Sequence, residues 1–242
     1  MAKESPLHQF TIERLIPIHV GGYDVSFTNS SLMMTIAVAL ITAFIVLAMR
    51  NAALVPTRFQ SMAEILYDFI AKMVDENVGD EGKRYFPFLF TLFMFILFGN
   101  LLGMIPFSFT YTSHVIVTFA LAATVFIGVT LIGIYRHGFK FLSLFVPHGV
   151  PWVLLLLLVP IEILSYCIRP FTLAIRLFAN MMAGHTMLAI FAGFVGALGV
   201  FGLAPIAMDS ALVLLEFLVA ALQAYVFTIL SCLYLHDAIH LH

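Results

Sequence analysis

Five long apolar blocks divide this chain, and their lengths constrain its fold more than any other feature. A helix of about 20 apolar residues crosses the hydrocarbon core of a bilayer. The blocks lie at residues 32–49, 86–105, 112–135, 150–198 and 204–235. Only 10% of the 242 residues are charged, against roughly 25% in soluble domains. We therefore predict an all-α polytopic membrane protein with about five membrane helices.

The last two blocks are too long for one upright span each. Pro160 and Pro170 can kink or interrupt block 150–198, because proline removes a backbone N–H donor and clashes with the preceding turn. Four glycines suggest a bend or hairpin between the two blocks. They are Gly193, Gly196, Gly199 and Gly202. We expect two long inclined helices, and an extra turn hidden within either block remains an alternative.

Residues 56–85, between the first two spans, have the pattern of an amphipathic helix. Apolar side chains recur there at helical spacing, and charged side chains occupy other positions. The apolar positions are Phe59, Met62, Ile65, Leu66, Phe69, Ile70 and Met73. The pattern predicts a helix at the membrane surface or against a partner, with a solvated surface helix as the alternative. Together with an N-terminal segment at 1–31 on the outer side, we expect 1–242 to form a single integral membrane domain.

The positions of lysine and arginine predict how the chain is oriented in the membrane. Short cytoplasmic loops are enriched in these residues, and here they gather in the connections after the first and third spans. They are Arg50, Arg58, Lys72, Lys83, Arg84, Arg136 and Lys140. With five spans these two connections share the inner side, so that the N-terminus lies outside and the C-terminus inside. Met1–Asp24 lacks the features of a secretory signal, so we expect insertion through the spans themselves.

Arg176 lies deep inside the fourth apolar block. An arginine keeps its charge at any accessible pH, and placing it mid-membrane costs about 2.5–3.5 kcal/mol on insertion scales. Two series of polar residues with a spacing of seven run through the last two blocks. They are Glu162, Arg169 and Arg176, then Asp209, Glu216 and Gln223. Because seven residues are close to two helical turns, each series stays on one helix face. Such polar stripes indicate a pathway for a small ion.

The stretch around Arg176 is highly distinctive: Arg176–His185 reads Arg-Leu-Phe-Ala-Asn-Met-Met-Ala-Gly-His. A second stretch, Leu222–Leu230, reads Leu-Gln-Ala-Tyr-Val-Phe-Thr-Ile-Leu. Together with Gly99–Pro106 and Pro6–Phe10, these stretches resemble subunit a of the F-type ATP synthase membrane sector, in the form found in alphaproteobacteria and mitochondria. The likeness covers nearly the whole chain.

The resemblance implies a stator subunit beside a rotating ring of c subunits. In that family two offset half-channels connect the ring carboxylates with opposite sides of the membrane, and the arginine that matches Arg176 separates them. The implied partners are the c ring, b-type peripheral stalk subunits, the catalytic head through the complex, and membrane lipids. The chain is expected to bind no nucleic acid, cofactor or metal and to be no enzyme by itself. The expected location is the bacterial inner (plasma) membrane, with the mitochondrial inner membrane as the alternative.

The resemblance also assigns positions along the proton path. Glu162 corresponds to the acidic group of the inner path, and His185 and Glu216 correspond to a pair in the outer path. Many bacterial members carry the acid and the histidine of this pair in exchanged positions, whereas mitochondrial members share the order seen here. Asn180 and Gln223 match positions near the arginine, where their amides can hydrogen-bond the guanidinium or water.

Structural roles compete with these assignments for several residues. Asp209 can cap the last helix, and Arg169 can pair with Glu162 or extend toward the inner surface. Asn100 can serve as an amide that packs helices together. A solvated chain end is the preferred reading of the region that contains His236.

Other functional classes stay open at this point. A sodium-translocating version of the same subunit and a self-contained polytopic ion transporter are the main alternatives. A haem-binding cytochrome needs paired histidines on facing helices, and only His185 lies well inside a block. An intramembrane hydrolase is disfavoured because no HExxH or GxSxG pattern is present. His236 and His240 lie four residues apart and could hold a metal, although they sit at the chain end.

Overall fold

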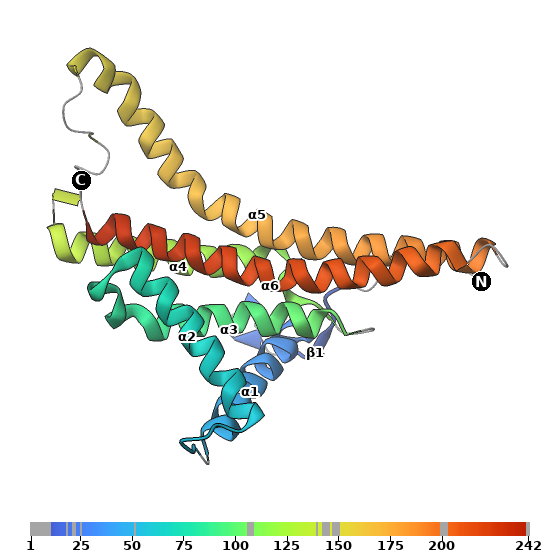
Figure 1. Cartoon of the computed structure of the whole chain (residues 1–242). Helices are drawn as coiled ribbons and strands as arrows, with labels where there is room; N and C mark the ends of the chain where they lie inside the picture. The colour runs from blue at the N-terminus through green and yellow to red at the C-terminus, as the bar shows by residue number, and fades with distance from the viewer. Residues whose placement is uncertain are drawn as a thin grey trace.

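The chain is almost entirely helical in the computed structural model (Figure 1). The structure describes residues 11–17, 19–20, 23–24, 26–50, 52–105, 109–138, 140–141, 146, 151–198 and 203–240. The helices are α1 (Asn29–Met49), α2 (Arg58–Val78), α3 (Phe86–Gly103), α4 (Val115–His137), α5 (Trp152–Leu198) and α6 (Leu203–Ile239), with short 3-10 helices η2 (Asp80–Tyr85) and η3 (Tyr111–Ser113).

Five of the described helices are long and apolar enough to cross a membrane: α1, α3 together with η2, α4, α5 and α6. All five predicted spans are therefore present, and the all-α polytopic fold is confirmed. The ends differ from the predicted ones by a few residues, most at the end of α6, which runs to Ile239 instead of residue 235. Pro6–Phe10 and the glycines at 199 and 202 lie outside the described residues.

Local chemistry explains where several helices begin and end. Thr28 and Thr57 cap α1 and α2, and each hydroxyl accepts a hydrogen bond from a backbone N–H in the first turn. This arrangement satisfies one of the N–H groups that a helix start leaves free. At the other end, α2 stops at Gly79 and α4 at Gly138, where φ is 79° and 55°. Glycine adopts this left-handed region without the cost that a Cβ imposes.

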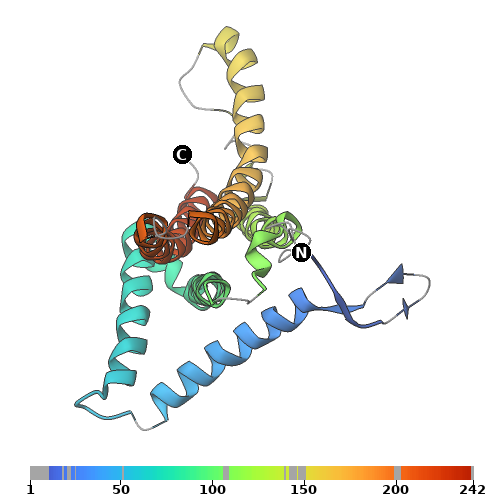
Figure 2. The same cartoon turned by 90° about the vertical axis from the view of Figure 1, so that its right-hand side faces the viewer.

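Helices α5 and α6 have 47 and 37 residues. At about 1.5 Å per residue they measure roughly 70 Å and 55 Å, far more than the hydrocarbon core of about 30 Å. The prediction that the last two helices are long is confirmed, and their length agrees with the predicted inclination. Pro160 and Pro170 lie inside α5 without breaking it. In Figures 1 and 2 the C-terminal half of α5 lies antiparallel along α6, while its N-terminal half bends away from the bundle. The two missing N–H donors give a physical cause for this bend.

The amphipathic segment forms α2, and its apolar face divides into two parts. Ile70, Met73, Val74 and Val78 are buried in the core against side chains of other helices. Phe59, Met62 and Ile65, nearer the start, are more than half exposed. The second half of α2 therefore packs within the chain itself, whereas the first half fits the predicted role at a membrane surface or partner.

The core lies between α2, α3, α4, α5 and α6. Its buried side chains include Ile70, Phe93, Val125, Leu177 and Phe227. Asn100 of α3 is fully buried, and its Nδ2 donates a hydrogen bond of 3.2 Å to the carbonyl of Ala220 in α6. The alternative of a helix-packing amide thus describes the contact that Asn100 makes. An amide in this role links two helices without a charge inside the membrane, although Oδ1 of Asn100 is buried with no hydrogen-bond partner among the described residues.

Among the described residues, four short strands precede α1, and no pattern in the sequence predicted them. They are β1 (Arg14–Ile16), β2 (His19–Val20), β3 (Tyr23–Asp24) and β4 (Phe27–Thr28). The pairs β1–β4 and β2–β3 are antiparallel. The Asn29 side chain donates a hydrogen bond of 3.1 Å to the carbonyl of Thr11, so the N-terminal segment is fastened to the start of α1.

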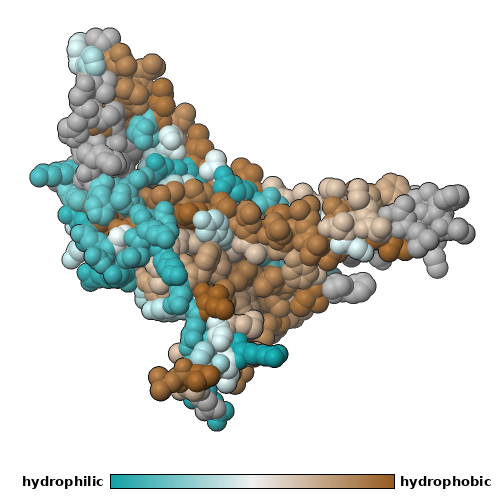
Figure 3. Space-filling model, in the orientation of Figure 1, coloured by the Kyte–Doolittle hydropathy of each residue, from teal (hydrophilic) through white to brown (hydrophobic). Residues whose placement is uncertain are grey.

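Polar side chains gather at one end of the molecule, where α2 and the C-terminal ends of α4 and α6 lie (Figures 1 and 3). An ion pair joins Arg136, at the end of α4, to Glu81 of η2. His137 Nε2 lies 2.9 Å from the carbonyl oxygen of Ile239. The two basic connections and the end of α6 are therefore held together, which agrees with the prediction that they share one side.

Candidate functional site

The polar series of α6 faces the interior of the bundle. Glu216 and Gln223 are buried, with 7% and 1% exposed, and Asp209 is half-buried. Their spacing of seven keeps them in line along the helix, as predicted. A buried polar group is costly without a partner. The hydrogen-bond and ion-pair partners of these side chains must therefore be sought on the facing side of α5.

Asn180 of α5 and Gln223 of α6 form a direct hydrogen bond across the two helices. The Nδ2 of Asn180 donates to Oε1 of Gln223 over 2.7 Å. The two amides therefore bind one another, where the sequence suggested that they could bind the guanidinium of Arg176. The Nε2 of Gln223 is buried and has no hydrogen-bond partner among the described residues, so one donor of this amide is unused there.

His185 of α5 and Glu216 of α6 form a second polar pair. Nδ1 of His185 lies 3.5 Å from Oε1 of Glu216, and neither carboxylate oxygen has a hydrogen bond within the described part of the chain. The backbone of α5 makes room for this carboxylate at Gly184, where a Cβ would lie 2.5 Å from Oε1 of Glu216. The sequence prediction that this histidine and this acid form a pair agrees with the geometry.

A further residue that the sequence analysis missed contacts His185 from the other side. The hydroxyl of Thr110, in the connection between α3 and α4, lies 3.1 Å from Nε2 of His185. Thr110 is 3% exposed. It stands 75 positions before His185 in an uncharged connection, and no local pattern in the sequence marks it.

Arg176 has a different environment from these pairs. It is exposed, and it shares its face of α5 with Thr172, Ala179 and Ala183, which are also exposed. Within the described residues it forms no hydrogen bond or ion pair. A permanent cation thus lies on the outer face of an apolar helix, in line with the small side chains of Thr172, Ala179 and Ala183. Small residues let another helix approach closely in a membrane.

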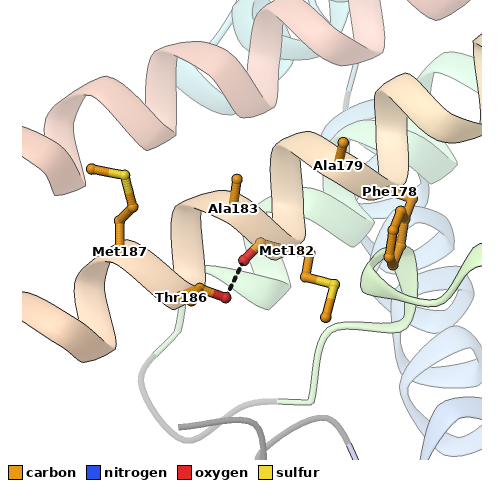
Figure 4. A pocket seen from close by; sticks show the side chains of 6 residues that line it. All are labelled: Phe178, Ala179, Met182, Ala183, Thr186 and Met187. Carbon is orange, nitrogen blue, oxygen red and sulfur yellow. Dashed lines mark hydrogen bonds between the residues drawn. The ribbon is translucent and has the colours of Figure 1, made fainter.

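A shallow groove begins one turn after Arg176 on the same helix. It has a volume of about 480 Å³. Its lining consists of Phe178, Ala179, Met182, Ala183, Thr186 and Met187 (Figure 4). The hydroxyl of Thr186 is bonded to the carbonyl of Met182 over 2.7 Å, within the helix itself. The groove therefore presents an apolar surface with no free polar group of its own.

The other members of the polar series on α5 do not join the pairs of the seam. Glu162 lies on the N-terminal half of α5 and has no hydrogen bond or ion pair with a described residue. Arg169 Nη1 lies 3.0 Å from Oδ2 of Asp237 in α6, and its guanidinium carbon is 5.4 Å and 4.9 Å from the ring centres of Tyr166 and Tyr234. The suggested Arg169–Glu162 pair is therefore wrong, because an acid on the neighbouring helix lies closer in space.

The suggestion that Asp209 caps the last helix is also wrong. Helix α6 begins at Leu203, and Pro205 is tolerated inside its first turn, where the backbone N–H has no helical partner in any case. Asp209 thus lies in the second turn, with a buried Oδ1 that forms no hydrogen bond within the described residues.

No group of three or more His, Cys, Asp or Glu side chains in the described ranges is placed to hold a metal ion. The rings of His236 and His240 stack with their centres 4.7 Å apart.

Comparison with known proteins reveals the family. Residues 31–236 match the family model described as ATP synthase A chain. The chain belongs to this family. A relative named ATP synthase subunit a from Paramagnetospirillum magneticum is 59% identical, covering 98% of this chain and 99% of the relative. Proteins of the same name from Parvibaculum lavamentivorans and Rhodospirillum rubrum are 58% and 55% identical, covering 97% and 98% of this chain and 93% and 99% of the relatives.

The match begins within α1 and ends within α6, and it includes Arg176, Asn180, His185, Glu216 and Gln223. The family resemblance predicted from Arg176–His185 and Leu222–Leu230 is confirmed over the length of the chain. This member of the ATP synthase A chain family is a polytopic helical membrane protein. Its last two helices carry both series of polar residues with a spacing of seven.

Proposed function

We propose that this chain is the stator subunit of the proton-translocating sector of an F-type ATP synthase. The observation that carries the proposal is the exposure of Arg176 on the apolar outer face of α5, without a hydrogen bond or ion pair to a described residue. A cation in this position needs a partner from another chain. A ring of c subunits, each with one carboxylate in the membrane, supplies that partner.

Arg176 acts on the carboxylate that passes it. At about 4 Å and an effective dielectric constant of about 20, opposite charges attract by about 4 kcal/mol. This attraction favours the ionised carboxylate by roughly a thousandfold and makes it release its proton beside the arginine. Once the ring carries the carboxylate on into lipid, the group must be neutral again. Because the guanidinium does not lose its own proton, Arg176 also prevents direct transfer between the two access paths.

The remaining candidates divide into two groups along α5. His185 follows Arg176 by nine residues, roughly 13 Å along the helix, and Glu162 precedes it by fourteen, roughly 21 Å. We assign His185 and Glu216, with the nearby amides of Asn180 and Gln223, to the path that opens on the outer side of the membrane, where the N-terminus of the chain lies. We assign Glu162 to the path that opens on the inner side. The two paths open on opposite sides of Arg176, so a proton must travel with the ring to pass from one to the other.

The transported ion in this proposal is the proton. An imidazole accepts and releases a proton near neutral pH, and His185 lies against a buried carboxylate. The chain contributes the path and the fixed charge and carries out no chemistry on ATP. Its further partners are b-type peripheral stalk subunits, and through them the catalytic head. Because the relatives are bacterial, we place the complex in the bacterial inner membrane.

Substitution of Arg176 tests this function. We expect Arg176→Lys and Arg176→Ala to abolish proton-driven ATP synthesis in liposomes that contain the whole complex. A lysine loses its proton more readily when desolvated, so the conservative variant fails as well. Arg136→Lys is the matched control, because its exposed ion pair lies at the polar end of the molecule and such pairs contribute little. Synthesis at the normal rate in either Arg176 variant would refute the proposal.

A further inference from the structure

Thr110 occupies a position between a helix end and the imidazole of His185. Its hydroxyl donates a hydrogen bond of 3.3 Å to the carbonyl of Gly103, the last residue of α3, and it also lies 3.1 Å from Nε2 of His185. The last carbonyls of a helix have no partner within the helix. Thr110 therefore satisfies one of these carbonyls while it contacts the ring.

This double contact determines which ring nitrogen carries a hydrogen. A hydroxyl has one hydrogen to donate and two lone pairs that accept. The Gly103 carbonyl can only accept, so with the hydrogen of Thr110 directed to it, the ring nitrogen that faces Thr110 is the donor. Nε2 of His185 then carries a hydrogen, and the lone pair or second hydrogen of the ring is at Nδ1, 3.5 Å from Glu216.

The surroundings hold Thr110 in place. A Cβ on Gly103 would lie 2.5 Å from Cγ2 and 2.7 Å from Oγ1 of Thr110, so the glycine is what allows the close approach. The Thr110 carbonyl accepts hydrogen bonds from the Ser113 side chain over 2.6 Å and from its N–H over 3.2 Å. The next residue, Tyr111, is 1% exposed, and its hydroxyl donates to the carbonyl of Phe95 over 3.0 Å.

We propose that Thr110 is a positioning residue of the proton path, which fixes His185 with its hydrogen on Nε2 and turns Nδ1 toward Glu216. This inference rests on the proposed function. The pair of His185 and Glu216 then has one site for a transferable proton, located between Nδ1 and the carboxylate. When the site is empty, the imidazole is neutral and Glu216 is ionised. When it is filled, the proton is on Nδ1 or on Glu216, and the hydrogen on Nε2 stays in place in both states.

Each cycle adds one proton to the pair of His185 and Glu216 and removes one proton from it. A proton from water on the side of η3 joins the empty pair, and the pair later gives one proton to the ionised carboxylate of the ring. No proton passes through Nε2, because its hydrogen is bound to Thr110. The other titratable groups nearby are Asp209, two turns earlier on α6, and His114, directly after η3.

Removal of the hydroxyl tests the role of Thr110. In the complete complex, Thr110→Val and the smaller Thr110→Ala lose the acceptor for Nε2–H, whereas Thr110→Ser keeps it. The loss disfavours the imidazolium form, which needs an acceptor at both nitrogens. We measure ATP synthesis in liposomes while the pH on the proton-entry side is varied and the pH on the other side is fixed. Thr118→Val is the control, since that buried hydroxyl bonds carbonyls of its own helix start, those of His114 and Val115.

We expect the entry-side pH for half-maximal synthesis to move to a more acidic value by about half to one pH unit in Thr110→Val and Thr110→Ala, the effect of one lost hydrogen bond. We expect Thr110→Ser and Thr118→Val to keep the original profile. An unchanged profile in both Thr110→Val and Thr110→Ala, or the same displacement in Thr110→Ser, would overturn the inference. If only one of Thr110→Val and Thr110→Ala assembles into the complex, the pH profile of that variant tests the inference.

A second pair of variants separates this inference from the proposed function. His185→Ala and Glu216→Gln remove the proton site itself. If both variants keep the original rate and profile, the assignment of the pair to the path is wrong. If both lose synthesis while Thr110→Val and Thr110→Ala behave like the original chain, the pair remains in the path and only the role of Thr110 is refuted.

Discussion

Gly184 leaves the space that the carboxylate of Glu216 occupies between α5 and α6. A methyl group at this position would lie 2.5 Å from Oε1 and 2.8 Å from Cδ of Glu216. The contacted atoms form the end of a flexible side chain, so the carboxylate can move away at little cost in stability. Its distance from His185 would then change, and a proton transfer depends on that distance.

We therefore expect Gly184→Ala to lower the rate of proton-driven ATP synthesis by about 10- to 100-fold, the effect of a misplacement near 1 Å, while the complex still assembles. Gly193→Ala is a close control on the same helix, because a Cβ there would have no neighbour within 4 Å. The measurement is the synthesis rate per assembled complex in liposomes. Equal rates in the two variants would mean that the position of the carboxylate is unimportant.

At the scale of single residues, the sequence predicted which residues belong to the polar pairs better than it predicted their contacts. The spacing of seven and the family resemblance identified His185, Glu216 and Gln223, because helix periodicity is a local property. Thr110 could not be found in this way, because its contact depends on how the connection before α4 folds back onto α5. The orientation of the Asn180 amide toward Gln223 likewise depends on the packing of two helices.

At the scale of elements, α5 and α6 are fastened to one another near the end of α6 by Arg169 and Asp237. The side chains are 23% and 34% exposed, and Tyr166 and Tyr234 cover the guanidinium. A partly buried pair beside aromatic rings is worth more than an exposed one. The sequence predicted both helices from apolar length, but the partner of Arg169 lies 68 residues away and follows only from their packing.

We expect Arg169→Ala and Asp237→Ala each to lower the thermal stability of the solubilised complex, and the double variant to be no less stable than the single ones. The expected coupling is about 1 kcal/mol, which corresponds to a few degrees in melting temperature. Lys83→Ala and Asp80→Ala supply the control cycle, because those side chains are 65% and 91% exposed and exposed pairs contribute little. Additive losses in the Arg169–Asp237 cycle would show that the two residues act independently.

At the scale of the whole molecule, the distribution of polarity defines two ends. The ion pair of Arg136 with Glu81 and the contact of His137 with Ile239 bring two connections and the end of α6 together, and hydrophilic residues cover that region (Figure 3). The count of apolar blocks predicted this arrangement, since an odd number of spans puts the termini on opposite sides. The short strands before α1 escaped prediction, because segments of two or three residues have no detectable period.

Labelling from one side of the membrane tests this arrangement. In a chain with Cys167 and Cys232 replaced by alanine, we introduce Thr11→Cys, Arg58→Cys or Lys140→Cys and add a maleimide that does not cross membranes. We expect Arg58→Cys and Lys140→Cys to react in inverted vesicles, and Thr11→Cys to react in vesicles of the original orientation. Permeabilised vesicles, in which all three react, give the reference. Reaction of Thr11→Cys and Arg58→Cys from the same side would contradict the topology.

The arm formed by the first half of α5 has a consequence for how the complex works. It bends away from its own bundle (Figure 1), and most of its side chains before Tyr166 are exposed or half-buried. Glu162 lies on this arm. In the proposed complex, neighbouring subunits and lipid hold the arm at its angle, so a change in a neighbouring chain can widen or close the entrance assigned to Glu162 without altering a residue of this chain.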